Sequence, residues 1–289
     1  MNRNSLFIRH MSAQEVSLAV KWAALEGWNP GIHDAQCFFS ADQQGFLVGM
    51  SDGVPVGCIS AVRYGLEYGF IGFYIVRPEW RGQGYGLQLW NSAIEQLAGR
   101  IIGLDGVVAQ QKNYQKSGFE WAYNNIRYCG SGMEKFCIDA TELRQEISVI
   151  PANQLKQADL HAYDSKLFFT TRAEFLSGWL KQPQSLALAA LINNDIAGYG
   201  VIRQCETGWK IGPLFAEDAA IAEKLLLSLA AYAKGEEVFW DVPEVNYVAV
   251  DLAGKYKMTK VFETARMYKG DVPRINTEKI FGVTTFELG

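Results

Sequence analysis

The sequence has few of the residues that bind metal ions or form disulfide frameworks. Its 289 residues include three histidines and five cysteines. The histidines are far apart in the sequence, and no two cysteines have the CxxC spacing that is typical of zinc sites and redox motifs. We therefore expect no metal site, and reduced thiols as in a cytoplasmic protein.

Long apolar runs and an excess of positive charge are also missing. The longest apolar run, LALAALI at 186–192, is too short to span a bilayer, and the N-terminus lacks the apolar segment of a signal peptide. The formal net charge of −4 provides no basic field for nucleic acid or an anionic membrane. These absences favour a cytoplasmic protein without membrane or nucleic-acid partners.

Hydrophobic patterns predict the order βα(α)βββαβαβ for the first half. Alternation at 45–64 and 68–76 indicates a hairpin and a third strand, and helical spacing of apolar residues begins at Gly86. Further strands are expected at 100–107 and 121–128. Hairpins followed by crossovers predict an α/β fold, in which a mostly antiparallel mixed sheet has helices on both faces.

The second half repeats this order of elements. A shift of 140 residues places the stretch FIGFYIV on KIGPLFA, which indicates an internal duplication. We therefore expect two tandem domains of one fold, residues 1–140 and residues 150–289, joined near 138–150.

The stretch RPEWRGQGYG at 77–86 places three glycines at alternate positions behind Arg81. Successive main-chain N–H groups at the start of a helix form a cradle for an anion, and glycine lets a phosphate approach closely. The pattern lacks the spacing of a dinucleotide fingerprint, and no lysine follows Gly86 as a Walker loop requires. The sequence therefore predicts a diphosphate site of another kind.

This stretch resembles the motif V-x-P-x-x-R/Q-G-x-G-x-G/A of the GNAT superfamily of N-acetyltransferases, and NYQKSGFEW at 113–121 resembles the family's Y-x-K-x-G-F segment. The resemblance implies acetyl-CoA as the cosubstrate, with its diphosphate at the loop and its pantetheine arm along the preceding strand. The residues expected to bind it are Ile75, Val76, Arg81, Gly82, Gln83, Gly84, Tyr85 and Gly86. One departure is Val107, where the family usually has asparagine.

The whole length also resembles tandem proteins whose C-terminal half is a YitH/HolE-type acetyltransferase domain. This resemblance implies acetyl transfer to a primary amine of a small molecule, and we expect direct attack in a ternary complex. A non-catalytic acyl-CoA-binding regulator, a longer acyl donor and a protein amine stay open as alternatives. The duplication favours a monomer that is itself a pseudo-dimer, with a weak homodimer as the alternative.

Catalytic roles are expected for a few groups. By the resemblance, Tyr114 reaches the thioester sulfur, and its hydroxyl, with an ordinary pKa of about 10, can protonate a thiolate of pKa about 8.5. The main-chain N–H of Val76 is the expected oxyanion donor. Glu67, which precedes the strand at 68–76, is a candidate base, although a solvated surface position explains this carboxylate equally well.

A turn at 27–31 is expected to lie over the acceptor by the same resemblance. The candidate acceptor-binding residues are Glu26, Trp28, Asn29 and Asp34. The second half contains no glycine at 221–226, which the 140-residue shift places opposite the glycine loop. We expect it to keep the fold without binding coenzyme A, and to cover the acceptor site of the first half.

Overall fold

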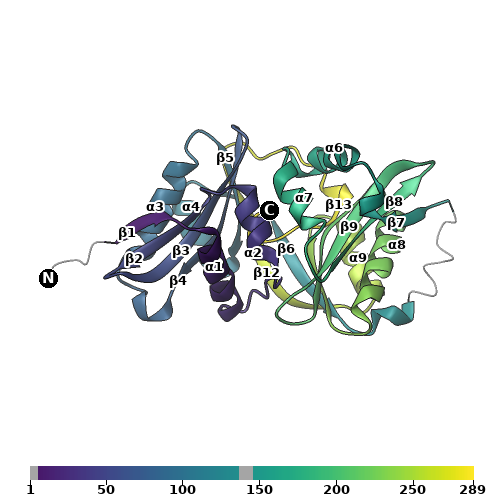
Figure 1. Ribbon diagram of the computed structural model, residues 1–289, viewed down its shortest axis with the longest axis horizontal. Helices are drawn as coiled ribbons and strands as arrows, with labels where there is room; N and C mark the ends of the chain where they lie inside the picture. The colour runs from purple at the N-terminus through teal and green to yellow at the C-terminus, as the bar shows by residue number, and fades with distance from the viewer. Residues whose placement is uncertain (1–5, 137–145) are drawn as a thin grey trace.

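The computed structural model describes residues 6–136 and 146–289, so the predicted junction near 138–150 lies largely outside the described residues. The predicted order of elements is confirmed in both halves (Figure 1). The chain is therefore an α/β protein that uses one succession of elements twice. No helix among the described residues is long and apolar enough to cross a membrane.

The elements of the first half are β1 (Phe7–His10), α1 (Ala13–Leu25), α2 (Asp34–Ala41), β2 (Phe46–Ser51), β3 (Val54–Tyr64), β4 (Tyr68–Val76), α3 (Tyr85–Gln96), β5 (Ile101–Val107), α4 (Gln111–Lys116) and β6 (Glu120–Gly130). Those of the second half are β7 (Ser148–Pro151), α6 (Gln157–Phe168), α7 (Ala173–Trp179), β8 (Ser185–Ile192), β9 (Asp195–Gln204), β10 (Trp209–Ala216), α8 (Ala219–Ala230), β11 (Val238–Pro243), α9 (Tyr247–Lys255), β12 (Thr259–Lys269) and β13 (Ile280–Gly282).

The strands of both halves form one continuous sheet. Its order is β1-β2-β3-β4-β5-β12-β6-β11-β10-β9-β8-β7, with β13 beside β10. Strand β12 of the second half lies between β5 and β6 of the first, and β6 in turn pairs with β11 of the second. The two expected sheets are thus parts of one sheet, because each half gives its last strand to the other.

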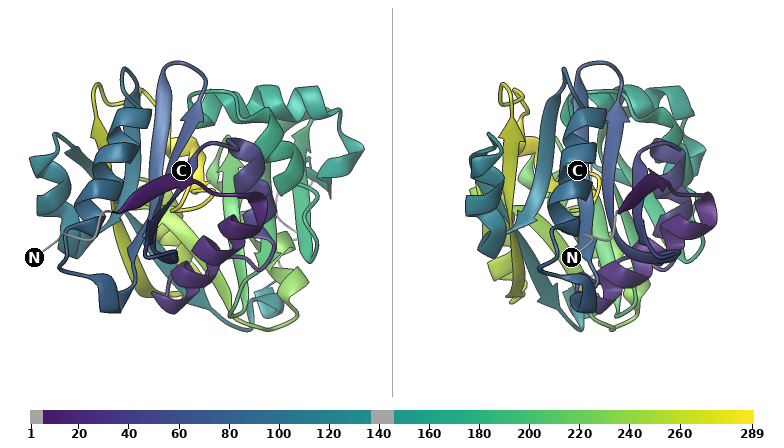
Figure 2. Two further views of the ribbon diagram at one scale, coloured as in Figure 1. Left: turned by 60° about the vertical axis from the view of Figure 1, so that its left-hand side comes forward. Right: turned by 90° about the vertical axis from the view of Figure 1, so that its left-hand side faces the viewer.

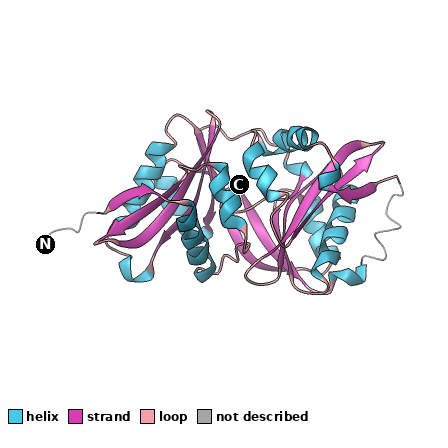
Figure 3. Cartoon of the chain, in the orientation of Figure 1, coloured by secondary structure: helices cyan, strands magenta, loops and turns pink. Residues whose placement is uncertain are grey.

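Helices cover both faces of this sheet (Figures 2 and 3). In the first half, α1 and α2 contribute to one apolar core, and α3 and α4 to another. Helix α7 of the second half packs on α2, where the rings of Phe38 and Trp179 stack with centroids 5.9 Å apart. The halves therefore share a helical contact as well as a sheet.

Buried ion pairs also join the halves. Arg127 on β6 makes two hydrogen bonds to the Asp241 carboxylate on β11, of 2.6 and 2.7 Å, and the two side chains are only 3% and 1% exposed. Among residues 6–136 and 146–289, the other ion pairs that cross between the halves are Arg203–Asp34 and Arg266–Asp105. A buried charge is costly without its partner, so these pairs fix how the halves meet.

Asp241→Ala leaves the Arg127 guanidinium buried without its counter-ion. We expect the free energy of unfolding, measured by urea titration, to fall by about 3–5 kcal/mol. The control is Glu263→Ala, which removes an exposed pair with Lys260 and should cost at most about 1 kcal/mol. Equal losses in the two variants would contradict the structural role of the buried pair.

Candidate active site

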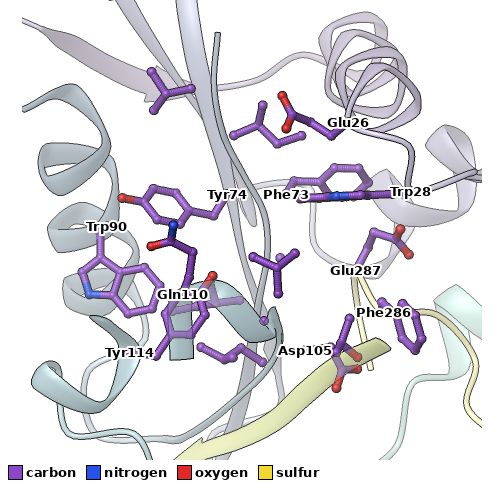
Figure 4. A pocket seen from close by; sticks show the side chains of 18 of the residues that line it. Glu26, Trp28, Phe73, Tyr74, Trp90, Asp105, Gln110, Tyr114, Phe286 and Glu287 are labelled. Atoms are coloured by element: carbon purple, nitrogen blue, oxygen red, sulfur yellow. The ribbon is translucent and has the colours of Figure 1, made fainter. Parts of the chain in front are cut away.

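A cavity opens where β4 and β5 stop pairing. These parallel strands pair from Tyr68 opposite Ile101 only as far as Ile71 opposite Leu104, although both continue beyond. The cavity has a volume of about 380 Å³ and is lined by both strands and by segments from elsewhere in the chain (Figure 4). The separated strand ends thus leave main-chain groups free to face a ligand.

An irregularity in β4 accompanies this separation. Phe73 has a φ of +46°, and the register between β3 and β4 shifts between Cys58 and Ser60. A bulge of this kind bends a strand and increases its twist. Phe73 lies two residues after Ile71, which is the last residue of β4 that pairs with β5. The bulge is therefore placed to direct β4 away from β5.

The glycine loop lies at the end of β4 and leads into α3. Gly82 and Gly84 have φ values of +76° and +81°, and a Cβ added to either would meet no atom within 4 Å. Gly84 is the N-cap of α3, and no hydrogen bond from the N–H groups of residues 82–87 is found within the described part of the chain. These groups have the arrangement that binds a phosphate at a helix N-terminus.

The third glycine of the loop also has a packing role. A Cβ on Gly86 would lie 2.7 Å from the Tyr74 hydroxyl oxygen on β4. This glycine therefore lets α3 pack closely on the strand, in addition to the predicted contact of its N–H with a phosphate. The neighbouring Tyr85 side chain is buried with its hydroxyl near Ser51, so only its main-chain N–H can face a ligand.

Arg81 lies at the mouth of the cavity, and its side chain is half exposed. Its guanidinium donates to the Glu26 carboxylate and to the main-chain oxygen of Val76. Gln83 donates to the main-chain oxygen of Glu79, at 3.4 Å. Arg81, which directly precedes Gly82, is thus already engaged by a carboxylate.

Tyr114 lines the cavity from α4. Its ring stacks on Trp90 with centroids 5.4 Å apart, and it lies so close to β5 that a Cβ on Gly106 would be 2.2 Å from the ring. Burial, and to a smaller extent the nearby Tyr74, raises the pKa of Tyr114 to about 12. The phenol is therefore protonated over the whole physiological range.

The four candidates around the turn at 27–31 separate into two pairs. Glu26 and Trp28 line the cavity. Asn29 instead bonds to the main chain of Thr207, and Asp34 is fully buried in its ion pair with Arg203. Asn29 and Asp34 therefore fasten the turn to the second half rather than facing the cavity.

Glu67 does not line the cavity. It lies in the turn that precedes β4, at the end of that strand opposite to the cavity, and its N-terminal neighbours Gly65 and Leu66 are exposed. The sequence pattern placed this carboxylate next to the correct strand but not at the correct end of it.

The C-terminal segment supplies residues that the sequence analysis missed. After β13 the chain crosses to the first half, where Phe286 and Glu287 line the cavity and the Leu288 oxygen accepts from the Tyr64 hydroxyl. A Cβ on Gly72 would lie 2.0 Å from the main-chain oxygen of Glu287. Strand β12 adds Phe262 and Thr264 to the lining. The second half therefore forms part of this cavity.

Comparison with known proteins identifies the family. Residues 13–119 match the acetyltransferase (GNAT) family, and residues 160–282 match a further acetyltransferase (GNAT) domain. A holothin acyltransferase from a Pseudoalteromonas strain is 32% identical over 279 residues, which are 96% of this chain and 92% of the relative. The chain belongs to the GNAT family of acetyltransferases. It is a tandem GNAT protein, and it is an acyltransferase.

Other relatives agree with this assignment. An uncharacterised N-acetyltransferase of Bacillus subtilis, YitH, is 25% identical over 196 residues, 67% of each chain. A putative acetyltransferase from Pyrococcus horikoshii superposes with a TM-score of 0.77 at 22% identity, covering 98% of this chain and 96% of that one. A tandem GNAT protein from the clavulanic acid biosynthesis pathway superposes with a TM-score of 0.60 at 12% identity, and the match covers 93% of this chain and 100% of that one. These two structures show that the fold is shared.

The second GNAT repeat has no equivalent loop. Strand β10 ends at Ala216 and α8 begins at Ala219, whereas residues 77–84 separate β4 from α3. The Asp218 side chain caps α8 by accepting from the Ile221 N–H, so a carboxylate stands where an anion would bind. Because the loop is shorter, the 140-residue shift that fits the strands does not fit the helix. Residues 217–218, which connect β10 to α8, contain no glycine either.

The gap between the parallel strands of this repeat is also filled. Strands β10 and β11 pair only from Trp209 opposite Val238 to Ile211 opposite Trp240, and β13 then pairs with β10. The segment passes so close to Gly212 that an added Cβ would be 2.5 Å from the Thr284 oxygen. Gly212 corresponds to Gly72 at the 140-residue shift, so one segment crosses both gaps.

Gly72→Ala should displace the C-terminal segment. The new methyl group would meet the main-chain oxygen of Glu287, which cannot move alone, so we expect a loss of about 1–3 kcal/mol in the free energy of unfolding, measured by urea titration. The matched control is Gly254→Ala on α9, where nothing lies within 4 Å, and it should add up to about 1 kcal/mol of stability. A gain in both variants would contradict the close packing.

Proposed function

We propose that this GNAT protein is an acetyl-CoA-dependent N-acetyltransferase that acetylates a primary amine of a small molecule in a ternary complex. One observation carries the proposal: the cavity that Tyr114 lines with its protonated phenol is also lined by Val76 and Arg81, directly before the loop whose N–H groups are free at the start of α3. The first arrangement suits a diphosphate and the second suits a leaving thiolate.

The first half supplies the groups for the coenzyme. The loop of Gly82, Gln83, Gly84, Tyr85 and Gly86 offers its N–H groups to the diphosphate, and Arg81 adds a charge-assisted contact. Ile75 and Val76 border the cavity and offer the strand edge to the pantetheine arm.

The orientation of β4 supports an oxyanion role for Val76. The N–H of Arg77 donates to Val56 on β3. In an antiparallel strand the N–H groups of successive residues point to opposite sides of the strand. The N–H of Val76 therefore points away from β3 and toward the gap. There it can donate to the oxygen that becomes negative when the amine adds to the thioester carbonyl.

The reaction then needs one attack and two proton movements. The neutral amine forms a bond to the carbonyl carbon, the carbon–sulfur bond breaks, and Tyr114 gives its proton to the sulfur. The proton that the nitrogen loses restores the phenol. No cysteine lines the cavity among the described residues, and burial raises the pKa of Cys37 to about 12. Direct attack is therefore favoured over a covalent acetyl-enzyme.

The tandem arrangement supports a monomer. Exchange of β6 and β12 buries within one chain the edges that two separate domains would expose.

The acyl donor is less restricted than the coenzyme, because the relative from Pseudoalteromonas is named an acyltransferase rather than an acetyltransferase. Acyl-CoA thioesters longer than acetyl-CoA therefore belong in the same assay.

Calorimetric titration with acetyl-CoA should show one site per chain. Gly84→Glu should abolish it, because the new carboxylate repels the diphosphate. The matched control is Gly53→Glu in the β2–β3 turn, where φ is +77° and the space is equally open, and it should bind as the parent does. Two sites per chain would contradict the degenerate second repeat, and no binding would contradict the proposed function.

Tyr114→Phe should lower kcat by at least about 100-fold while leaving the affinity for acetyl-CoA unchanged. The assay is thiol release with benzylamine as a probe acceptor. Because the pKa of Tyr114 is raised to about 12, the parent should keep its acid function from neutral pH up to about pH 11. Tyr128→Phe on β6, outside the cavity, is the control. Unchanged kcat in Tyr114→Phe would remove the acid role.

A further inference from the structure

Three carboxylates line the cavity, and only one of them is free to take part in chemistry. Glu26 is paired with Arg81 at the mouth. Asp105 uses both oxygens, since Oδ1 accepts from Asn125 and Arg266 and Oδ2 accepts from Arg266. The third carboxylate belongs to Glu287, whose Oε1 is buried without a hydrogen-bond partner among the described residues.

The position of Glu287 is set by main-chain contacts. Its main-chain oxygen lies against Gly72, and its N–H donates to the Thr285 hydroxyl. The residue is only 4% exposed, yet it lines the cavity. Its carboxylate is thus removed from bulk water, in a residue that borders the space available to a ligand.

Glu287 and Tyr114 lie on opposite sides of the cavity (Figure 4). Tyr114 is on the side of Trp90 and Tyr74, whereas Glu287 is on the side of Trp28 and Phe286. The leaving group departs from the carbonyl carbon on a different side from the one on which the nucleophile attacks. If the sulfur is next to Tyr114, the amine approaches from the side of Glu287.

Several charged groups surround Glu287. Burial raises its pKa above the ordinary value, and Asp34 adds to this. The cations that oppose the shift are Lys210, Arg127 and Arg203. Each of these is held elsewhere, because Lys210 donates to the main-chain oxygen of Asn29 and the two arginines bond to Asp241 and Asp34. No cation among the described residues forms an ion pair with Glu287 itself, although these three charges favour its ionised form.

We propose that Glu287 binds the acceptor as an ammonium ion and takes the proton that converts it into the attacking amine. This inference rests on the proposed acetyl transfer. A nitrogen–hydrogen bond breaks and the proton moves to a carboxylate oxygen, so the amine is neutral when it attacks, and the proton leaves to solvent after the product forms. The aromatic rings of Trp28 and Phe286 line the same side. The acceptor class is therefore a cationic primary amine with an apolar or aromatic body.

The test compares two probe amines in the full-length protein with acetyl-CoA. Benzylamine is an ammonium ion at neutral pH, whereas aniline is already neutral. Glu287→Gln should lower kcat with benzylamine by about 100-fold or more, because a general base contributes about this much. With aniline the loss should be less than about 10-fold, since no ammonium proton has to be removed. Glu287→Asp should restore part of the rate.

The pH profile gives a second readout. With benzylamine, the parent rate should fall as pH drops through the raised pKa of Glu287, since only the ionised carboxylate accepts a proton. In Glu287→Gln the rate should instead rise about tenfold per pH unit toward the pKa of the amine, because only the neutral amine then reacts. Glu120→Gln, which replaces an exposed carboxylate outside the cavity with an amide, should follow the parent.

The outcomes distinguish a failure of the proposed function from a failure of the role of Glu287. If the parent does not bind acetyl-CoA, the proposed function is wrong. Binding of acetyl-CoA without turnover of either probe would overturn the cationic acceptor. Turnover in the parent with equal losses for benzylamine and aniline, or with an unchanged pH profile, would overturn the role of Glu287 alone. Calorimetric binding of acetyl-CoA to Glu287→Gln shows that the variant is folded.

Discussion

The guanidinium group of Arg127 joins the parts of the chain that form the acceptor side of the cavity. It makes two hydrogen bonds to Asp241 and one to the main-chain oxygen of Trp28, and it lies 4.8 Å from the centre of the Phe286 ring. These contacts connect β6, β11, the turn at 27–31 and the C-terminal segment. A buried pair of this kind contributes little net stability compared with apolar packing, but it penalises every arrangement that leaves one charge alone. Its effect is to specify one position for each part.

The two sides of the cavity have different origins. On the first repeat's side the cavity is lined from β4, Arg81 and α4, whereas β12 and the C-terminal segment of the second repeat complete the other side. The second repeat has only a short connection between β10 and α8, and β13 pairs with β10 where β10 and β11 separate. The segment that fills this gap goes on to line the cavity of the first repeat. A single stretch of chain thus fills one gap and completes the other.

Local patterns predicted the parts that depend on local structure. The hairpin at 45–64 and the strand-to-helix loop at 77–86 each combine a few neighbouring residues, and both are present. The exchange of β6 and β12 could not be predicted from the sequence. Either strand can form main-chain hydrogen bonds with any antiparallel neighbour, so only tertiary packing selects the partner. Glu287 was missed for a related reason. A single glutamate between Phe286 and Leu288 has no spacing that indicates chemistry, and its function depends on where β13 directs the chain.

The pair of Arg81 and Glu26 connects the two sides at the mouth of the cavity. The pair is partly exposed, and exposed ion pairs contribute at most about 1 kcal/mol. On the proposed function, a diphosphate in the glycine loop competes with Glu26 for Arg81, because it is the more highly charged of the two partners. A Glu26 carboxylate displaced in this way stays next to Trp28 in the lining of the cavity. On the proposed function, binding of the coenzyme therefore adds a negative charge to the acceptor's path, and a cationic acceptor is attracted only once its cosubstrate is in place.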